Sequence, residues 1–547
     1  MRQLKTVSGT LVDIPNRNMF GARIDVSEQG DIESITADSN PEPGFILPGF
    51  VDAHVHVESS MLGPVAFARE AVRHGTLGVV QDPHEIANVL GIKGVDFMLA
   101  EAARTPLFFA TGAPSCVPAT PFETAGAELD HNDITQLLAR NEVTHLSEMM
   151  NVPGVLNRES GVMAKLEAAR QHGKPVDGHA PGLRGADLST YVQAGISTDH
   201  ECLDLDEALE KAAAGLSIQL RYGSAARIFT PLLPLIDRFP QSCMFCSDDK
   251  HPDDLMRGHI DEMVRIAVQE GIDIFHVLQA ACVNPVLHYS LPLGLLREGD
   301  RADWIEVEDL QTFHVKRSVL KGKVVAEKGV SVLPMEEPLD QPNQFLLQPI
   351  TSGSLRVPAK QGACRLITVT DGDLITGSVT CFPTIVDGTV VADASRDILK
   401  LVVCNRYAEY PEPAVAMVSG IGLQRGAFAA SIAHDSHHLV AVGCDDTALE
   451  RAINMVIGSK GGLAAVDGQG REELMPLPVA GLMTTMNCEQ AAESYIRLNA
   501  LVRACGCPLH APFMTLSFLS LPVIPNLKLT DQGLFDGIQF RRVGFWV

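Results

Sequence analysis

Short apolar runs alternate with amphipathic helical segments from about residue 48 to about residue 293. The first helical segment, Pro64–Arg73, has proline at its start and Gly75 just past its end, the usual asymmetry of helix termini. This alternation indicates repeated β-α units and a parallel sheet. The first strand is expected within Phe45–Ser59, and seven more at Thr76–Gln81, Leu107–Gly112, Val143–Ser147, Pro175–Gly178, Ile196–Asp199, Ser217–Arg221 and Cys243–Ser247.

Eight strands, each followed by a helix and covering about 250 residues, predict an α/β fold of the (β/α)8 TIM-like barrel type. An open doubly wound sheet is the alternative arrangement of such units. However, no glycine-rich dinucleotide fingerprint follows the first strand. We therefore place a barrel at 48–293.

The segments on both sides of the barrel contain strand patterns that are too short to fold alone. Residues 1–47 hold strand fragments at Thr10–Ile14 and Ile32–Ile35, and residues 294–332 are also rich in strand patterns. We expect the two segments to combine into one small β-sandwich domain. Residues 333–350 are expected to be a linker, and residues 351–547 a further C-terminal α/β domain.

Charge and composition restrict the class of protein. The formal net charge of −24 excludes nucleic acid and anionic membrane as partners, because both require a basic surface. Twelve cysteines without a disulfide framework, and no secretory signal at the start, favour a reduced cytoplasm. No apolar run is long enough to span a bilayer.

The first predicted strand ends in two histidines, His54 and His56. Residues two apart in a strand point to the same side, so both imidazoles would face one point, as a divalent transition metal requires. Two solvated histidines on an exposed edge would give the same pattern. The pair alone does not separate these two interpretations.

The other strand ends favour the metal. The chemistry of such a barrel lies at the carboxyl ends of its strands. Ligand-type side chains occur at six of the eight ends, a set too large for strand caps alone: His54 and His56, Asp82-Pro83-His84-Glu85, Glu148, His179, His200-Glu201, and Asp248-Asp249. These are enough ligands for two divalent ions bridged by a carboxylate, with a hydroxide between the ions as the nucleophile. Asp248 could accept the proton of the attacking water and pass it to a leaving group. The set predicts metal-assisted hydrolysis.

Several motifs resemble known sequences. Pro48–His56 resembles the opening motif of the amidohydrolase superfamily, and Gly294–Asp303 resembles that superfamily's return into its small β-domain. Ten further stretches are similar to bacterial adenine deaminases and together extend over nearly the whole chain: His56–Met61, Asp82–Val89, Ser115–Ala119, Glu148–Val155, Asp177–Leu183, Gly223–Arg227, Ser247–Asp249, His434–His437, Ala480–Met483 and Leu519–Pro525.

This resemblance implies an enzyme that converts adenine to hypoxanthine and ammonia in purine salvage, and a homodimer. It implies one metal held by His54, His56, Glu148 and Asp248, and a second held by Glu148, His179 and His200. Glu148 stands where many superfamily members carry a carboxylated lysine. The implied metals are Mn2+ or Fe2+, and mixed nitrogen and oxygen ligands would also accept Zn2+.

Further polar residues are candidates for contact with a purine. Asp82, His84 and Glu85 are predicted to bind substrate or a further metal, because ionisable groups that cluster at a barrel mouth are typical of functional sites. Glu201 and Glu58 are candidates for protonating a ring nitrogen. Arg221 and Arg227 would reach substrate or form internal salt bridges. The remaining predicted substrate contacts are Ser115 and the cluster His434, Asp435 and His437, which would cover the site and exclude water.

Three other functions compete with this prediction. Another amidohydrolase acting on a cyclic amide or related heterocycle would use the same ligands. A metal-binding scaffold without turnover would too, although such a scaffold needs no proton acceptor like Asp248. A single-zinc nucleobase deaminase needs His-x-Glu and Pro-Cys-x-x-Cys. His56-Val57-Glu58 and Cys243–Cys246 match only in part, because no proline precedes Cys243 and the barrel separates the two motifs.

Overall fold

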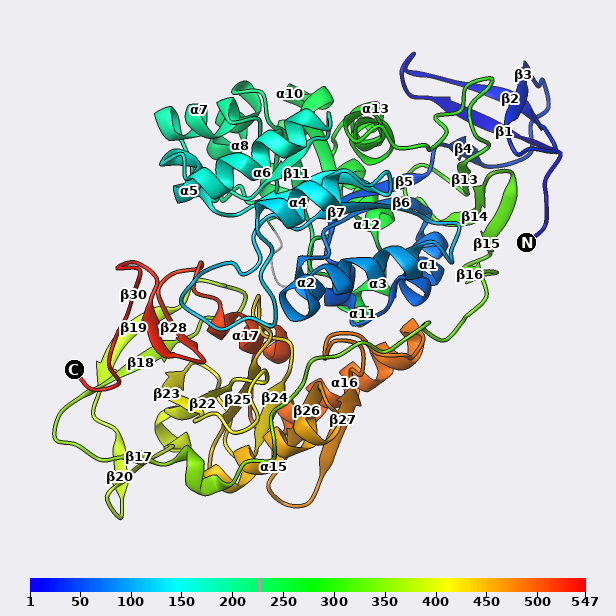
Figure 1. The fold of residues 1–547 in the computed structure, drawn as a ribbon. Coiled ribbons are helices and arrows are strands. Elements are labelled where there is room, and N and C mark those ends of the chain that lie inside the picture. The colour runs from blue at the N-terminus through cyan, green and yellow to red at the C-terminus, as the bar shows by residue number, and fades with distance from the viewer. Residues whose placement is uncertain (225–227) are drawn as a thin grey trace.

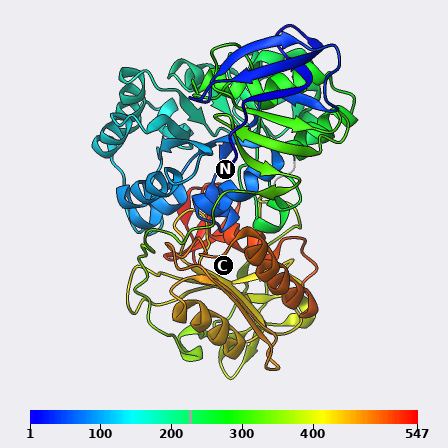
Figure 2. The same ribbon diagram turned by 90° about the vertical axis from the view of Figure 1, so that its right-hand side faces the viewer.

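The computed structural model describes residues 1–224 and 228–547. It has a barrel and a small sheet in one half and a C-terminal α/β lobe in the other (Figure 1). Figure 2 shows the two halves stacked, with the small sheet at the end of the barrel half remote from the C-terminal lobe. Among the helices of the described residues, none combines the length and the apolar character that a membrane crossing needs.

The eight predicted barrel strands are present. β5 to β9 form one parallel run and β10 to β12 form a second, and Ser197 N–H donates to Val176 O (2.9 Å) between the two runs. At the other side, Asp248 N–H donates to His54 O (3.0 Å) and His56 N–H to Asp248 O (3.1 Å), which closes the barrel. The prediction of a (β/α)8 barrel is confirmed. The strands are β5 Phe50–Val55, β6 Thr76–Gln81, β7 Phe108–Ala113, β8 Val143–Met149, β9 Val176–Gly178, β10 Thr198–Asp199, β11 Ser217–Arg221 and β12 Cys243–Cys246.

Local sequence signals place the barrel helices. Asp130 caps α4 by accepting from the N–H groups of Asn132 and Asp133. Helix α11 ends at Leu255 and α12 begins only at Ile260, because the chain turns through Gly258 and His259 between them. The helices are α1 Pro64–Ala71, α2 His84–Leu90, α3 Ile92–Ala102, α4 His131–Leu138, α5 Val152–Leu156, α6 Ser160–Gln171, α7 Gly185–Gln193, α8 Leu205–Ala213, α9 Phe229–Leu232, α10 Pro234–Arg238, α11 Pro252–Leu255, α12 Ile260–Gln269, α13 Ile274–Leu278 and α14 Asn284–His288.

The small sheet combines strands from both flanks of the barrel. Its order is β16-β15-β14-β13-β4-β1-β2-β3, so β4 joins the two sequence segments by pairing with β1 and with β13. Trp304 is fully buried in its core. The strands are β1 Thr6–Asp13, β2 Asn18–Val26, β3 Ile32–Ala37, β4 Phe45–Leu47, β13 Trp304–Val307, β14 Val315–Leu320, β15 Lys323–Glu327 and β16 Val330–Ser331.

The C-terminal lobe is built on a second large sheet, with the order β19-β18-β23-β22-β25-β24-β26-β27. Helix α15 (Asp446–Gly458) packs on β24, β25 and β26, whereas α16 (Cys488–Ala504) contacts both β27 and barrel helix α11. Helix α17 covers Pro512–Ser517. The strands are β17 Val357–Pro358, β18 Cys364–Thr368, β19 Gly377–Cys381, β20 Thr384–Val386, β21 Thr389–Val391, β22 Leu399–Cys404, β23 Ala414–Ser419, β24 Ala427–Ala430, β25 Leu439–Gly443, β26 Gly462–Val466, β27 Glu472–Pro476, β28 Leu527–Thr530, β29 Gly533–Asp536 and β30 Arg541–Arg542.

One hydrophobic core continues from the barrel into this lobe. It contains Phe67 and Phe245 of the barrel together with Phe428 and Leu463 of the C-terminal sheet, all with at most 1% of their surface exposed. A buried apolar contact between two lobes resists their relative motion, whereas a small polar contact allows it. The C-terminal lobe therefore sits in a fixed place on the barrel mouth.

Candidate metal centre

Three of the predicted ligands converge at the seam where the barrel closes. His54 Nε2 and His56 Nε2 lie 3.2 Å apart, and Asp248 Oδ1 lies 3.5 Å from the first and 3.2 Å from the second. All three side chains are buried. Two imidazole nitrogens and one carboxylate oxygen that face a common point are a donor set for a divalent cation. The residues present therefore fit the predicted metal.

Glu148, at the end of β8, connects this group to a second one. Its Oε1 lies 3.5 Å from His56 Nε2, while its Oε2 lies 2.7 Å from His179 Nδ1 and 3.3 Å from His200 Nε2. Burial alone would raise the pKa of Glu148, but His179 and His200 hold that pKa well below its usual value. An ionised carboxylate with one oxygen toward each group of histidines is suited to bridge two cations.

Arg221 holds the Asp248 carboxylate. Its Nη1 donates to Asp248 Oδ2 (2.7 Å), and its guanidinium also pairs with Glu201. Burial would raise the pKa of Asp248, but Arg221, His54 and His56 hold that pKa well below its usual value. Of the two hypotheses for Arg221, the structure shows the internal salt bridge. Arg227, the other predicted arginine, lies outside the described residues.

Behind the ligands, Asp52 connects the first and last strands of the barrel. Its Oδ1 accepts from Ser247 N–H (3.0 Å) and His54 N–H (3.3 Å), and its Oδ2 lies 2.8 Å from His259 Nε2. Asp52 is not among the residues predicted from the sequence. Its place two residues before His54, on the same face of the strand, was the available signal. His259 lies just before α12 and had no comparable signal.

Replacing Asp52 with asparagine tests this support. We expect Asp52→Asn to weaken metal affinity by about 10- to 100-fold, the usual cost of removing a partner behind the ligands, because an amide cannot accept all of these hydrogen bonds. Metal content after dialysis at graded free Mn2+ measures the effect. The surface variant Asp96→Asn is the control. Equal metal affinity in the two variants would contradict the supporting role.

A second polar cluster joins the barrel to the C-terminal lobe. Glu85 Oε1 lies 2.6 Å from His434 Nδ1, and its other oxygen contacts His437 Nε2. Burial lowers the pKa of His434, but Glu85 raises it to about 9. Asp435 Oδ1 lies 3.9 Å from His84 Nε2, and His84 Nδ1 lies 3.4 Å from Glu148 Oε1. The predicted cluster at 434–437 therefore lies over the ligands and is held there by Glu85.

The other predicted residues differ in how free their side chains are. Asp82 Oδ2 lies 3.1 Å from His84 Nδ1. Ser115 Oγ donates to the backbone oxygen of Glu148 (2.5 Å), so the hydroxyl is already engaged. Glu58 accepts from Ile86 N–H through Oε1 (3.2 Å), and its Oε2 has no hydrogen-bond partner among residues 1–224 and 228–547. Glu201 Oε1 lies 3.6 Å from His200 Nε2.

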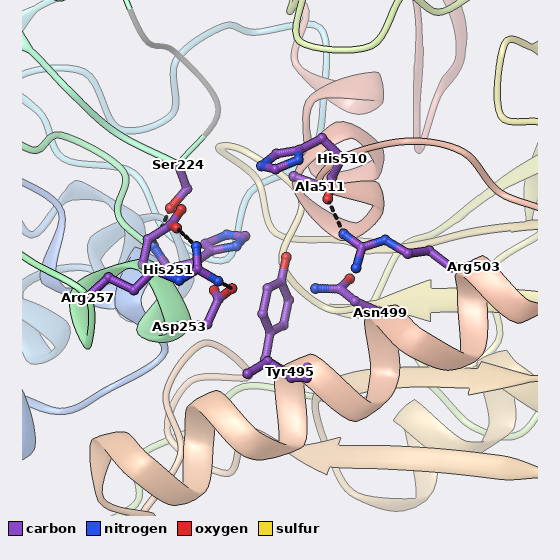
Figure 3. Close-up of a pocket in the computed structure, with 11 residues that line it drawn as sticks. Ser224, His251, Asp253, Arg257, Tyr495, Asn499, Arg503, His510 and Ala511 are labelled. Carbon is purple, nitrogen blue, oxygen red and sulfur yellow. Dashed lines mark hydrogen bonds and ion pairs between the residues drawn. The ribbon is translucent and has the colours of Figure 1, made fainter.

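A cavity of about 200 Å3 lies at the seam between the barrel and the C-terminal lobe (Figure 3). Ser224 and His251 form its barrel side, and Tyr495, Asn499 and Arg503 of α16 form the other side. His251 and Tyr495 meet edge to face, with ring centroids 4.8 Å apart. None of the predicted metal ligands lines this cavity, so it is separate from the metal centre.

Comparison with known proteins gives matches over nearly the whole chain. The amidohydrolase family model matches residues 45–325, and the model of the adenine deaminase C-terminal domain matches residues 373–541. The adenine deaminase of Salinibacter ruber is 52% identical over 99% of both chains, and that of Methanosarcina mazei is 47% identical over 99% of both chains. Among solved structures, the N-acetyl-D-glucosamine-6-phosphate deacetylase of Mycobacterium smegmatis aligns with a TM-score of 0.45 and 15% identity, over 59% of this chain and 100% of that chain.

Proposed function

The chain belongs to the adenine deaminases of the amidohydrolase family, and from this membership we propose that it hydrolyses adenine to hypoxanthine and ammonia in purine salvage. The observation that carries the proposal is the match to curated adenine deaminases over both the barrel and the C-terminal lobe. The convergence of buried histidines and carboxylates at the barrel mouth supports it, because a hydrolase of this family uses divalent metal.

We assign the metals to the two groups described above. His54, His56, Glu148 and Asp248 would hold one ion, and Glu148, His179 and His200 the other. The mixed nitrogen and oxygen donors suit Mn2+ or Fe2+ and would accept Zn2+. When bound, such ions supply the Lewis acidity that makes water a nucleophile near neutral pH.

The chain's own residues would move the protons. Water adds its oxygen to C6 of adenine, and Asp248 accepts a proton and returns it to the departing amine, which leaves as ammonia. Arg221 keeps Asp248 oriented through the 2.7 Å contact. Protonation of the ring nitrogen falls to Glu58 or Glu201, and the remaining proton of the added water restores that acid as the C6 carbonyl forms. Glu58 has the freer oxygen, since both oxygens of Glu201 face Arg221.

Substrate contacts are proposed from the second polar cluster. His84 lies 3.4 Å from Glu148, and Asp435 lies 3.9 Å from His84. Glu85 with His434 and His437 would fix the cover that excludes water during the reaction. We also propose that the protein is a homo-oligomer and that it is located in the cytoplasm. Light scattering of the purified protein would measure the molar mass and hence the number of chains per oligomer. The full set of proposed substrate residues is Asp82, His84, Glu85, Ser115, Arg227, His434, Asp435 and His437.

Metal removal and substrate choice test this function. After treatment with a chelator, we expect adenine turnover to vanish and to return on loading with Mn2+ or Fe2+, with hypoxanthine and ammonia formed in equal amounts. Hydantoin and an acetylated amino sugar should release nothing. Turnover of either one without turnover of adenine would favour another amidohydrolase. Metal binding without turnover of any of the three would favour the inactive scaffold.

A further inference from the structure

Glu123 is a buried acid that the mechanism above does not use. It lies in the loop between β7 and α4 and has 6% of its surface exposed. Neither carboxyl oxygen has a hydrogen-bond partner, and no salt bridge to Glu123 occurs within the described ranges 1–224 and 228–547. Burial raises the pKa of Glu123 well above its usual value, Asp435 and Asp531 raise it further, and the neighbouring Ser436 hydroxyl lowers it by less than these raise it. Burial without a paired cation favours the neutral form of a carboxyl, and that form carries one donor and one acceptor.

The neighbours of Glu123 lead back to the metal ligands. Asp435 and Ser436 lie beside it, with the Ser436 hydroxyl turned toward the carboxyl, and Asp435 Oδ2 and Ser436 Oγ make no close hydrogen bond among the described residues. Asp435 in turn lies 3.9 Å from His84, which lies 3.4 Å from Glu148. Buried polar atoms are rarely left unpaired, because each one costs about 1–3 kcal/mol. These unpaired atoms, the nearest of which lie close to the proposed bridging carboxylate of Glu148, therefore indicate that a polar ligand binds beside them.

A bound cation accounts for the unpaired atoms of Glu123, Asp435 and Ser436 less well than a neutral ligand does. Asp531 would be needed as a further ligand, but its carboxylate already accepts from Thr124 N–H (3.0 Å) and from Asn405 Nδ2 (3.1 Å). His438 Nε2 also lies 3.3 Å from it. Glu123 and Asp435 would then be the only two acidic ligands, with a serine hydroxyl as a weak third.

We propose that Glu123 is a specificity-determining residue that binds the N3–N9 edge of adenine. The inference rests on the proposed function, which directs the 6-amino group toward the metals and the opposite edge away from them. That edge presents an acceptor at N3 and a donor at N9–H. A neutral carboxyl supplies the complementary donor and acceptor in one plane. In adenosine the N9–H is replaced by ribose, so Glu123 would also select the free base over the nucleoside.

Substrate analogues combined with variants of Glu123 test this assignment. In the Mn2+-loaded wild type, we expect kcat/KM for adenine to exceed that for 3-deazaadenine, which lacks the N3 acceptor. Glu123→Gln keeps a donor and an acceptor and should preserve most of this ratio. Glu123→Ala should lower kcat/KM for adenine by about 10- to 100-fold and reduce the ratio by a similar factor, with metal content unchanged.

The control is Glu101→Ala, which removes another buried acid, on α3, that pairs with Arg104. It should lower thermal stability and leave the adenine to 3-deazaadenine ratio unchanged. If Glu123→Ala lowers kcat/KM for adenine and for 3-deazaadenine by the same factor, Glu123 has a structural role and the inference is wrong. If the variant loses bound metal, Glu123 is a cation ligand and the inference is also wrong. A metal-loaded wild type without adenine turnover would overturn the proposed function, and the inference with it.

Discussion

Asp248→Asn is expected to lower kcat for adenine by about 10³-fold or more while most of the metal stays bound. The asparagine oxygen can still face His54 and His56, but an amide cannot accept the proton that the reaction requires. Arg221 Nη1 donates to Asp248 Oδ2 (2.7 Å), and the amide nitrogen that replaces this oxygen cannot accept that hydrogen bond, so part of the loss would come from a less well oriented side chain. Steady-state kinetics with adenine and elemental analysis of the same sample measure the two effects.

The neighbouring residue supplies the control. Asp249 accepts a hydrogen bond from Ser59 Oγ (2.5 Å) and is not among the proposed ligands, so Asp249→Asn should keep kcat within about tenfold of the wild type. Unchanged turnover in Asp248→Asn would show that another group accepts the proton. A complete loss of metal would show that Asp248 acts as a ligand alone.

Glu148→Gln should have a comparable effect through metal binding. A glutamine has one acceptor oxygen and no charge, so it cannot face both the His54–His56 group and the His179–His200 group as the carboxylate does. We expect the variant to bind fewer than two ions per chain and to lose about 10³-fold or more in kcat. Elemental analysis after gel filtration, together with the adenine assay, measures both quantities.

Glu142→Gln is the matched control, because Glu142 is exposed and lies just before the same strand. It should retain full metal content and activity. If Glu148→Gln still bound two ions per chain, the bridging role of Glu148 would be wrong, although the residue could still orient His179 and His200.

The sequence predicted the barrel and the position of its chemistry because both follow from local patterns. Short apolar runs define strands, and parallel strands bring their carboxyl ends to one edge. Hence His54, Glu148 and Asp248, which are far apart in the sequence, were expected to lie together, and in the structure they do. Their role as metal ligands stays a prediction, as do the domain boundaries.

Local sequence patterns could not predict which side chains from distant segments contact each other. Nothing in the residues around Glu85 indicates that its partners are His434 and His437 in another lobe. Glu123 stands between a phenylalanine and a threonine and shows no periodicity that would mark a buried acid. Its importance depends on which groups surround it without pairing, and only the three-dimensional arrangement reveals that.

The cover formed by residues 434–437 has a consequence for how the protein is made. A ribosome synthesises the barrel and all six proposed ligands before His434 emerges, and domains generally fold as they appear. The nascent barrel is therefore open at its mouth during translation, and Glu85 lacks its partners His434 and His437 until the C-terminal lobe docks. This order gives metal ions a period of free access to His54, His56 and Glu148, which are nearly inaccessible in the finished protein.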